Sequence, residues 1–518
     1  MKNFLVKKII FRERPWMWQA ALAMMLLAGF ALRMYDLTDP PLDFAPTRQL
    51  FSALKARGMY YHYVTDAPEG KRELAIALGD TGTIEPPVME TIVSQTYRLT
   101  GEHLWIARIY SSFFWVVGGL ALFLLIRELA SSGAAIIGTL VYLFAPYGVI
   151  ASRAFQPDPL MVALIVFAIW ALFRWQNTSA QHLCTAPTRL GKWKWALLFG
   201  LFGGLALLVK NLSVFIVVGG FAGVILGARG LKRSIRDPQA WVMGGLLVLP
   251  TAVYTVYGMA TGRLEGQLAL RFFPQMWLEP AFYFSWQNLM SSAVGFGVWT
   301  LGVVGVFLAD ARRERPLLLG LWIGYIAFGM TFPYHFTTHD YYHLPVIPIA
   351  ALSLVPVVKV VLERFFQRNP GLFPRLVLVV LVLFGTAVQA WYARARLASA
   401  DYRNEAPFWE EIGDKLGHTA AVIGLTQDYG YRLAYWGWQN SSAWFTSADI
   451  QVRYMAGQDL DIRQKFAEDT AGKQYFLVTM FGELNNQPVI KDLLYSRYPV
   501  YAETDEYVIF DLQHPVSP

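Results

Sequence analysis

The sequence predicts a polytopic α-helical membrane protein that ends in a small α/β domain. Of its 518 residues, 55% are hydrophobic and only 16% are charged, which is far more apolar than a soluble protein of this length. Long apolar runs alternate with short polar segments through most of the chain, and the composition becomes that of a soluble protein near the carboxyl end. We therefore predict a membrane domain over residues 1–394 and a soluble domain over residues 395–518.

Eleven apolar stretches come close to the roughly 17 to 25 residues that a membrane-spanning helix needs. Two of them, on either side of Lys210, are short and are also compatible with a re-entrant pair. In chain order the stretches are Trp16 to Met34, Leu104 to Leu125, Ala134 to Val149, Pro159 to Trp175, Trp195 to Val209, Leu212 to Leu226, Trp241 to Met259, Ser291 to Leu308, Leu317 to Phe332, Val346 to Leu362 and Leu376 to Trp391.

The basic residues predict how these spans are oriented. Short loops rich in Lys and Arg alternate with loops that hold few of either, as the positive-inside rule requires for eleven spans. The amino terminus, basic at Lys2, Lys7 and Lys8, is then cytoplasmic, and the carboxyl-terminal domain lies outside the cytoplasm. We expect a multi-pass protein of the cell (inner or plasma) membrane. The net charge of +7 is explained by this topology rather than by binding of nucleic acid.

The region after Asp401 has the pattern of strands alternating with helices. The predicted helices are Glu405 to Leu416, Asp461 to Ala471 and Gln487 to Arg497, and the predicted strands are Ala420 to Leu425, Gln474 to Met480, Val500 to Ala502 and Tyr507 to Leu512. Such alternation indicates an α/β domain. It contains no Gly-rich phosphate loop and no Ser/His/Asp arrangement, so we expect it to support or cover a site formed elsewhere. The single cysteine, Cys184, excludes an internal disulfide.

The first long loop, residues 36–103, carries the first candidate for chemistry. Two segments, Pro46 to Tyr61 and Val88 to Leu99, have the spacing of amphipathic helices at a membrane interface. Asp43 stands between apolar neighbours with Arg48 one helical turn beyond it. A carboxylate in that setting is either an ion-paired structural group or a general base beside a cation, and both interpretations stay open. For Asp36 and Asp39 we favour a structural role at the end of the first span.

Two later turns add charged residues on the same face. Arg153 and Asp158 lie in a tight Pro-containing turn, where Asp158 either caps the next helix or joins Asp43 as a second acid over one cavity. Lys210 stands alone between two spans. It is either a lysine that reaches the membrane surface or a ligand for a lipid-linked phosphate.

The segment from Phe332 to Pro345 gathers three histidines, one aspartate and three tyrosines. The histidines are four residues apart, which raises the question of a metal site, but no HExxH pattern is present and the prolines interrupt a helix. A divalent metal is therefore not favoured. We expect His339, Asp340 and Tyr342 to form hydrogen bonds to a sugar or a phosphate.

Taken together, these features resemble the membrane glycosyltransferases of the C-type fold (GT-C), and among them the protein O-mannosyltransferase and lipid A aminoarabinose transferase group (glycosyltransferase families 39 and 83). The resemblance covers roughly Trp16 to Leu362. It is carried by the acid in the first loop, the Glu85-Pro86-Pro87 segment, Ala107-Arg108 at the start of the second span, the acid after the third span, Lys210, and the Tyr341-Tyr342-His343-Leu344-Pro345 segment. The chain departs from many relatives in having Phe44 after Asp43 and an acid, Glu85, before the Pro-Pro pair.

The resemblance implies a transferase that moves a sugar from a polyprenyl-phosphate donor to a hydroxyl of a lipid, glycan or protein on the extracytoplasmic face. It implies no cofactor. Asp43 and Asp158 would be the catalytic acids, and the substrate-binding residues would be Arg48, Glu85, Arg153, Lys210, His335, His339, Asp340 and Tyr342. Two alternatives stay open: a transporter or flippase of lipid-linked saccharides, and a noncatalytic relative with the same fold. Span centres almost free of charge, with no internal repeat, favour the transferase over the transporter.

Overall fold

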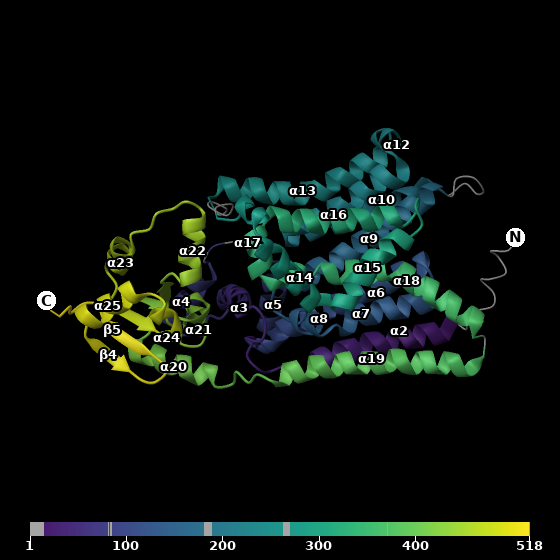
Figure 1. Cartoon of the computed structure of the whole chain (residues 1–518). Helices are drawn as coiled ribbons and strands as arrows, with labels where there is room; N and C mark the ends of the chain where they lie inside the picture. Colours follow the sequence, from purple (N-terminus) through teal and green to yellow (C-terminus); the bar gives the residue numbers. More distant parts are fainter. Residues whose placement is uncertain are drawn as a thin grey trace.

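The computed structural model describes residues 15–80, 82, 85–180, 189–262, 270–369 and 371–516. The basic amino-terminal residues and Cys184 lie outside these ranges. The described residues up to Ala398 are mostly helical, and Figure 1 shows most of these helices gathered into one elongated bundle. Their bounds are α2 (Pro15–Arg33), α3 (Pro46–Tyr61), α4 (Glu69–Gly79), α5 (Val88–Thr100), α6 (Trp105–Leu129), α7 (Ser132–Phe144), α8 (Pro146–Ala151), α9 (Asp158–Ala180), α10 (Arg189–Val209), η1 (Asn211–Ser213), α11 (Val214–Gly223), η2 (Val224–Arg229), α12 (Leu231–Ile235), α13 (Pro238–Ala260), η3 (Pro274–Leu278), α14 (Pro280–Val294), α15 (Phe296–Leu308), α16 (Arg315–Thr331), α17 (Pro333–Thr338), η4 (Asp340–His343), α18 (Val346–Arg368) and α19 (Leu372–Ala398).

The apolar helices agree with a protein that crosses the membrane many times. Among the described residues, seven helices are long and apolar enough to span a bilayer, and the pair α14 and α15, bent by 97°, makes up to eight. Three more apolar helices, α7, α16 and the part of α10 from Trp193 to Val209, are shorter. Each of the eleven stretches predicted from the sequence is helical. A multi-pass membrane protein is therefore confirmed, whereas the count of eleven spans stays a prediction.

The first loop is packed into the protein. Helix α3 has the predicted bounds and its middle turns are buried, while its position relative to a membrane interface stays a prediction. It packs against α4, α5 and α21 (Tyr431–Tyr435). Helix α4 was not predicted, and it lies so close to α3 that Gly58 and Gly79 meet backbone to backbone. These contacts hold α3 across one end of the bundle, where Figure 1 also shows the sheet.

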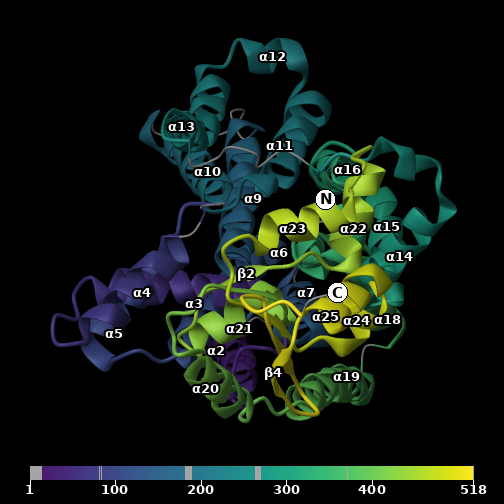
Figure 2. The same cartoon turned by 90° about the vertical axis from the view of Figure 1, so that its left-hand side faces the viewer.

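The region after residue 398 forms a five-stranded sheet flanked by helices, as the alternating pattern predicted. The strand order is β2-β1-β3-β5-β4, with β1 parallel to both β2 and β3 and with β5 antiparallel to β3 and β4. Figure 2 looks onto this region in front of the bundle. Its elements are α20 (Glu405–Leu416), β1 (Val422–Leu425), η5 (Gln427–Gly430), α21, β2 (Ser441–Ala443), α22 (Ser447–Met455), α23 (Ile462–Thr470), β3 (Tyr475–Val478), α24 (Phe481–Asn485), α25 (Pro488–Arg497), β4 (Val500–Glu503) and β5 (Val508–Asp511). The sequence missed the short elements β2, α21, α22 and α24.

Glycines set the closest helix contact in the bundle. Gly219 and Gly223 on α11 face Gly320 and Gly324 on α16, and their backbones touch. Small residues at this spacing let helices approach closely in a membrane, where van der Waals contact drives association. Residues with larger side chains have no room there.

We expect Gly320→Ala to destabilise the protein, because a methyl group at this position would overlap the carbonyl oxygen of Gly219. The cost of such overpacking is about 1–3 kcal/mol. Thermal unfolding in detergent measures it. Gly385→Ala on α19 is the matched control, since that position opens into free space within the described structure. Equal melting temperatures for the two variants would contradict the contact.

Candidate functional site

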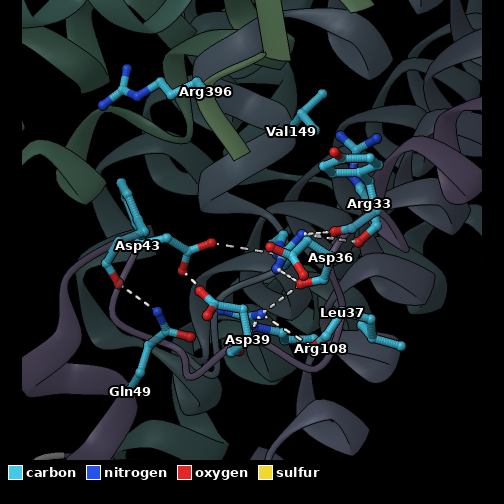
Figure 3. A network of polar contacts seen from close by, with 12 residues as sticks. Arg33, Asp36, Leu37, Asp39, Asp43, Gln49, Arg108, Val149 and Arg396 are labelled. Carbon is cyan, nitrogen blue, oxygen red and sulfur yellow. Dashed lines mark hydrogen bonds and ion pairs between the residues drawn. The ribbon is translucent and has the colours of Figure 1, made fainter. Parts of the chain in front are cut away.

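Asp43 is held by two buried arginines that also organise the loop in front of it. Arg108, on α6, donates to the carbonyl of Asp39 at 2.8 Å and to Oδ1 of Asp43 at 3.1 Å. Arg153 donates to the carbonyl of Asp36 at 3.0 Å, and its Nε lies 3.6 Å from Oδ2 of Asp43. Figure 3 shows the Asp43 carboxylate among these groups. Asp43 is therefore the counter-ion of an arginine pair, with 15% of its side chain exposed.

The two neighbouring acids tie this loop to the carboxyl-terminal region. Asp39 accepts a hydrogen bond of 2.9 Å from the backbone N–H of Tyr402. The carboxylate of Asp36 pairs with Arg403. Asp36 adopts a left-handed backbone at φ 46°, which Asp tolerates better than most residues. Their role is structural, as the sequence suggested, but they fasten two domains together rather than only ending a helix.

A cavity of about 360 Å³ lies between the first loop and the histidine segment. Six of the residues predicted to bind substrate line it: Arg48, Glu85, Lys210, His335, His339 and Tyr342. Arg271 and Tyr341 join them. Residues that are distant in the sequence, from α3, the loop before α5, the α10–η1 break and the turns α17 and η4, thus meet around one space.

The charges in this cavity are largely paired inside the protein. Glu85 accepts a hydrogen bond of 2.8 Å from Arg48. Burial opposes ionisation of Glu85, but the cations Arg48, Lys210 and Arg271 outweigh it and hold the pKa of Glu85 below its usual range. Lys210 binds both carboxylate oxygens of Asp158, at 2.9 and 2.8 Å. Among the described residues at the cavity, the cations are thus Arg48, Lys210 and Arg271, and the carboxylates that pair with them are Glu85 and Asp158.

Lys210 does not reach outward to water or headgroups. Its side chain is 3% exposed, and its ammonium lies 4.7 Å from the ring centre of Tyr341. Asp158 is the first residue of α9, where the helix dipole favours a carboxylate, and the same carboxylate holds Lys210. A non-helical Lys210, at the break between α10 and η1, places the ammonium at this junction.

The histidine segment is divided between the cavity and the core. His335 and His339 face each other with ring centres 5.1 Å apart. Burial, with a smaller effect of Arg271, lowers the pKa of His335 to about 4, and burial and His335 lower that of His339 to about 4. Both are neutral near pH 7 and serve as hydrogen-bonding groups. His343 points elsewhere, within 2.6 Å of the hydroxyl of Tyr325 and 2.9 Å of the carbonyl of Phe336.

The remaining predicted residues do not line this cavity. Asp43, Arg153 and Asp340 are absent from the lining formed by described residues, and Asp158 borders a small adjoining space with Lys210. No group of three or more His, Cys, Asp or Glu side chains suited to a metal occurs among the described residues. Sequence reasoning missed Arg271 and Tyr341 as cavity residues. Arg108 was named only as part of the Ala107-Arg108 motif. An arginine near the start of an apolar span is a signal that could have identified it as the partner of the acid in the first loop.

The arrangement of helices, loop and sheet recurs in solved structures. ArnT from Cupriavidus metallidurans matches in the apo state (16% identity, 96% of this chain and 98% of that chain, TM-score 0.57) and bound to undecaprenyl phosphate (17%, 94% and 97%, 0.58). The archaeal oligosaccharyltransferase AglB from Archaeoglobus fulgidus, in complex with an inhibitory peptide and a dolichol-phosphate, also matches (11%, 96% and 75%, 0.57). The chain has the GT-C fold. The fold that the resemblance implied is thereby confirmed.

A sequence comparison adds to this GT-C assignment. The profile of the family described as dolichyl-phosphate-mannose-protein mannosyltransferase matches residues 84–257. That segment runs from just before Glu85 to the last turns of α13 and includes Asp158 and Lys210. No curated protein sequence matches significantly.

The buried pair of Asp158 and Lys210 predicts a specific pattern of stability. Lys210→Met leaves a buried carboxylate without its cation, which costs about 3–5 kcal/mol. Adding Asp158→Asn removes the stranded charge and restores most of the loss, because a buried ion pair adds little net stability of its own. Melting temperatures in detergent test both. A single Lys210→Met variant as stable as the wild type would show that the pair is not formed.

Proposed function

We propose that this protein is an integral membrane glycosyltransferase. It moves a sugar from a polyprenyl-phosphate donor to a hydroxyl of a lipid, glycan or protein acceptor on the extracytoplasmic face. The observation that carries the proposal is the cavity where Arg48, Lys210 and Arg271 converge beside tyrosine hydroxyls. This cluster lies in a GT-C fold, and ArnT, which shares that fold, is known with undecaprenyl phosphate bound.

The residue types suit this chemistry. The acceptor oxygen attacks the anomeric carbon, the bond from that carbon to the phosphate oxygen breaks, and the electron pair leaves with the polyprenyl phosphate. Cations around the phosphate stabilise the charge that develops on the leaving group. One displacement inverts the anomeric centre and requires no carboxylate nucleophile. The neutral histidines His335 and His339 supply hydrogen bonds to the sugar or the phosphate without adding charge.

Within this proposal, Asp43 is the base that takes the proton of the acceptor hydroxyl. Arg108 and Arg153 fix its orientation. Asp158 positions Lys210 for the phosphate, since both of its oxygens are bound to that ammonium. Glu85 holds Arg48 in the same way until the donor phosphate competes for it.

A second candidate is a noncatalytic relative with the same fold. It is favoured by one observation: both carboxylate oxygens of Asp43 face buried arginines, as expected of a purely structural counter-ion. The transporter alternative has less support, because the Asp158–Lys210 pair closes on itself rather than lining a path through the bilayer.

We expect undecaprenyl phosphate to raise the melting temperature of the purified protein, because a ligand that binds only the folded state stabilises it. Arg271→Gln should weaken this binding by about tenfold or more, through loss of a charge-assisted contact. Arg403→Gln is the control, since Arg403 pairs with Asp36 away from the cavity lining. Equal binding of undecaprenol, which has no phosphate, would overturn the assignment of the cavity.

We expect Asp43→Asn to reduce sugar transfer at least about 100-fold, the usual contribution of a general base. Asn keeps an oxygen for Arg108, so expression and binding of undecaprenyl phosphate should persist. The donor for the assay is the lipid-linked sugar that copurifies with the protein, identified by mass spectrometry. Asp36→Asn, in the same loop, should retain activity. Full activity of Asp43→Asn would remove Asp43 as the base and support a structural role.

A further inference from the structure

A second, larger hollow lies between α4 and the sheet. This groove, which we call the α4 groove, has a volume of about 870 Å³. One wall is a face of α4 that includes Lys71 and Leu74, and the other carries Gln439, Ser442 and Lys473. It shares no lining residue with the cavity around Lys210. The proposed donor site therefore does not account for it.

The floor of the groove holds a buried polar atom without a partner. Gln439 is 1% exposed, and its amide nitrogen donates to the carbonyls of Ala420 and Asn440, both at 2.8 Å. Its carbonyl oxygen, Oε1, has no hydrogen-bond partner. A buried acceptor of this kind costs free energy unless a donor reaches it. Gln439 lines the groove, but Oε1 has almost no exposed surface, so an O–H or N–H group of a ligand reaches it only when the Gln439 side chain turns toward the groove.

The residue before Gln439 is strained in a way that shapes this floor. Trp438 adopts φ 48°, a left-handed conformation that is uncommon for a bulky side chain. Two cationic groups lie against its ring: the guanidinium of Arg57 is 4.2 Å and the ammonium of Lys71 is 4.1 Å from the ring centre. The strained turn is thus held by α3 and α4 together, next to a residue that lines the groove. Strain of this kind persists where the surroundings enforce it and gathers at functional sites.

The charges of the groove favour an acidic ligand. Lys71 and Lys473 come from opposite walls, and neither forms an ion pair with a described residue. Lys473 donates to the hydroxyl of Ser442 at 2.7 Å. Glu73 is the one carboxylate among the described lining residues, and His418, also in the lining, is paired with Asp414. The lysines outnumber the acid two to one.

The sheet geometry argues for a ligand recognised through side chains. Val422, Ser442 and Lys473 come from neighbouring parts of β1, β2 and the start of β3, so the groove crosses strands that already pair with each other. A peptide that adds to a sheet needs the length of an open strand edge. A carbohydrate chain instead offers hydroxyl groups to amide, hydroxyl and ammonium groups, which are the groups present here.

A ligand that occupies both the groove and the cavity must be long. Helix α3 joins them: Arg48 lines the cavity, and Arg57, nine residues further, supports Trp438 at the groove. Nine helical residues span about 14 Å at 1.5 Å each. Only an extended molecule lies in both places at once.

We propose that the α4 groove binds an acidic oligosaccharide, which is the acceptor chain for the transfer reaction. The acceptor role rests on the proposed function, whereas binding at the groove does not. Gln439 accepts a hydrogen bond from a ligand hydroxyl, Lys71 and Lys473 hold its acidic groups, and the chain extends along α3 toward the cavity.

Binding of hexagalacturonate to the full-length protein in detergent, measured by calorimetry, tests this proposal. Lys71→Gln and Lys473→Gln should each weaken binding at least about threefold, and the double variant about tenfold or more, as expected for charge-assisted contacts. Gln439→Met, which keeps the size but removes the acceptor together with the two amide donations, should weaken binding in the same way while the lysine variants, which keep those hydrogen bonds, separate ligand contact from loss of fold. Lys491→Gln, an exposed lysine outside the groove lining, is the matched control and should leave binding unchanged.

Three outcomes would overturn the proposal. They are no binding of hexagalacturonate, equal binding of neutral maltohexaose, and equal binding of hexaglutamate with the same dependence on the two lysines, which would point to an acidic peptide. Undecaprenyl phosphate binding is measured on the same preparation. If hexagalacturonate binds as expected but undecaprenyl phosphate does not bind, the result counts against the proposed function and not against the groove.

Discussion

The end of the bundle that carries the first loop depends on hydrogen bonds from buried arginines to backbone carbonyls. After α2 ends at Arg33, the chain runs without a helix to α3, and carbonyl groups buried in protein must find donors. Arginine has five N–H groups in a fixed fork, which suits that task. Arg108 and Arg153 both contact carbonyls of this segment, and their charge then requires an anion, which Asp43 provides. The position of the Asp43 carboxylate is thus a consequence of how the loop is built. Any proton transfer by Asp43 uses a carboxylate that the two arginines already hold in place.

The cations at the cavity are likewise compensated by carboxylates of the protein. Each of Arg48 and Lys210 has an internal carboxylate, so the empty cavity does not carry three uncompensated cations in a region of low dielectric. A bound phosphate would replace an internal partner rather than meet a bare charge. This limits the net gain in affinity but raises specificity, because an uncharged lipid cannot displace Glu85 or Asp158. The departure seen in the sequence, an acid before the Pro-Pro pair, becomes intelligible as the counter-charge of Arg48.

Hydrophobic periodicity was enough to predict the long apolar helices and most strands, because these elements follow from local pattern. It placed α20 at its observed bounds, and the family resemblance named six of the residues that line the cavity. What they missed depends on contacts between distant segments. Arg271 reads as an interfacial residue in its own loop and becomes a cavity residue only when that loop meets η4. The partners of α3 could not be predicted for a similar reason: the helix packs on α4, α5 and α21, which are distant or unpredicted elements. The elements β2 and α21 are too short for their pattern to stand out.

The contacts between the first loop and the carboxyl-terminal region make the two one functional unit. Arg57 donates to the carbonyl of Tyr435 at 2.5 Å, and the hydroxyl of Tyr435 reaches Glu102, which is also the ion-pair partner of Arg57. Thr47, at the other end of α3, donates to Asp428 at 2.7 Å. Helix α3 is therefore fixed to the carboxyl-terminal region at both ends. Its orientation places Arg48 at the cavity and Arg57 against the ring of Trp438 at the groove. Detachment of the carboxyl-terminal region would remove one wall of the groove and also release α3. This region therefore supports the position of Arg48, although none of the described residues that line the cavity comes from it.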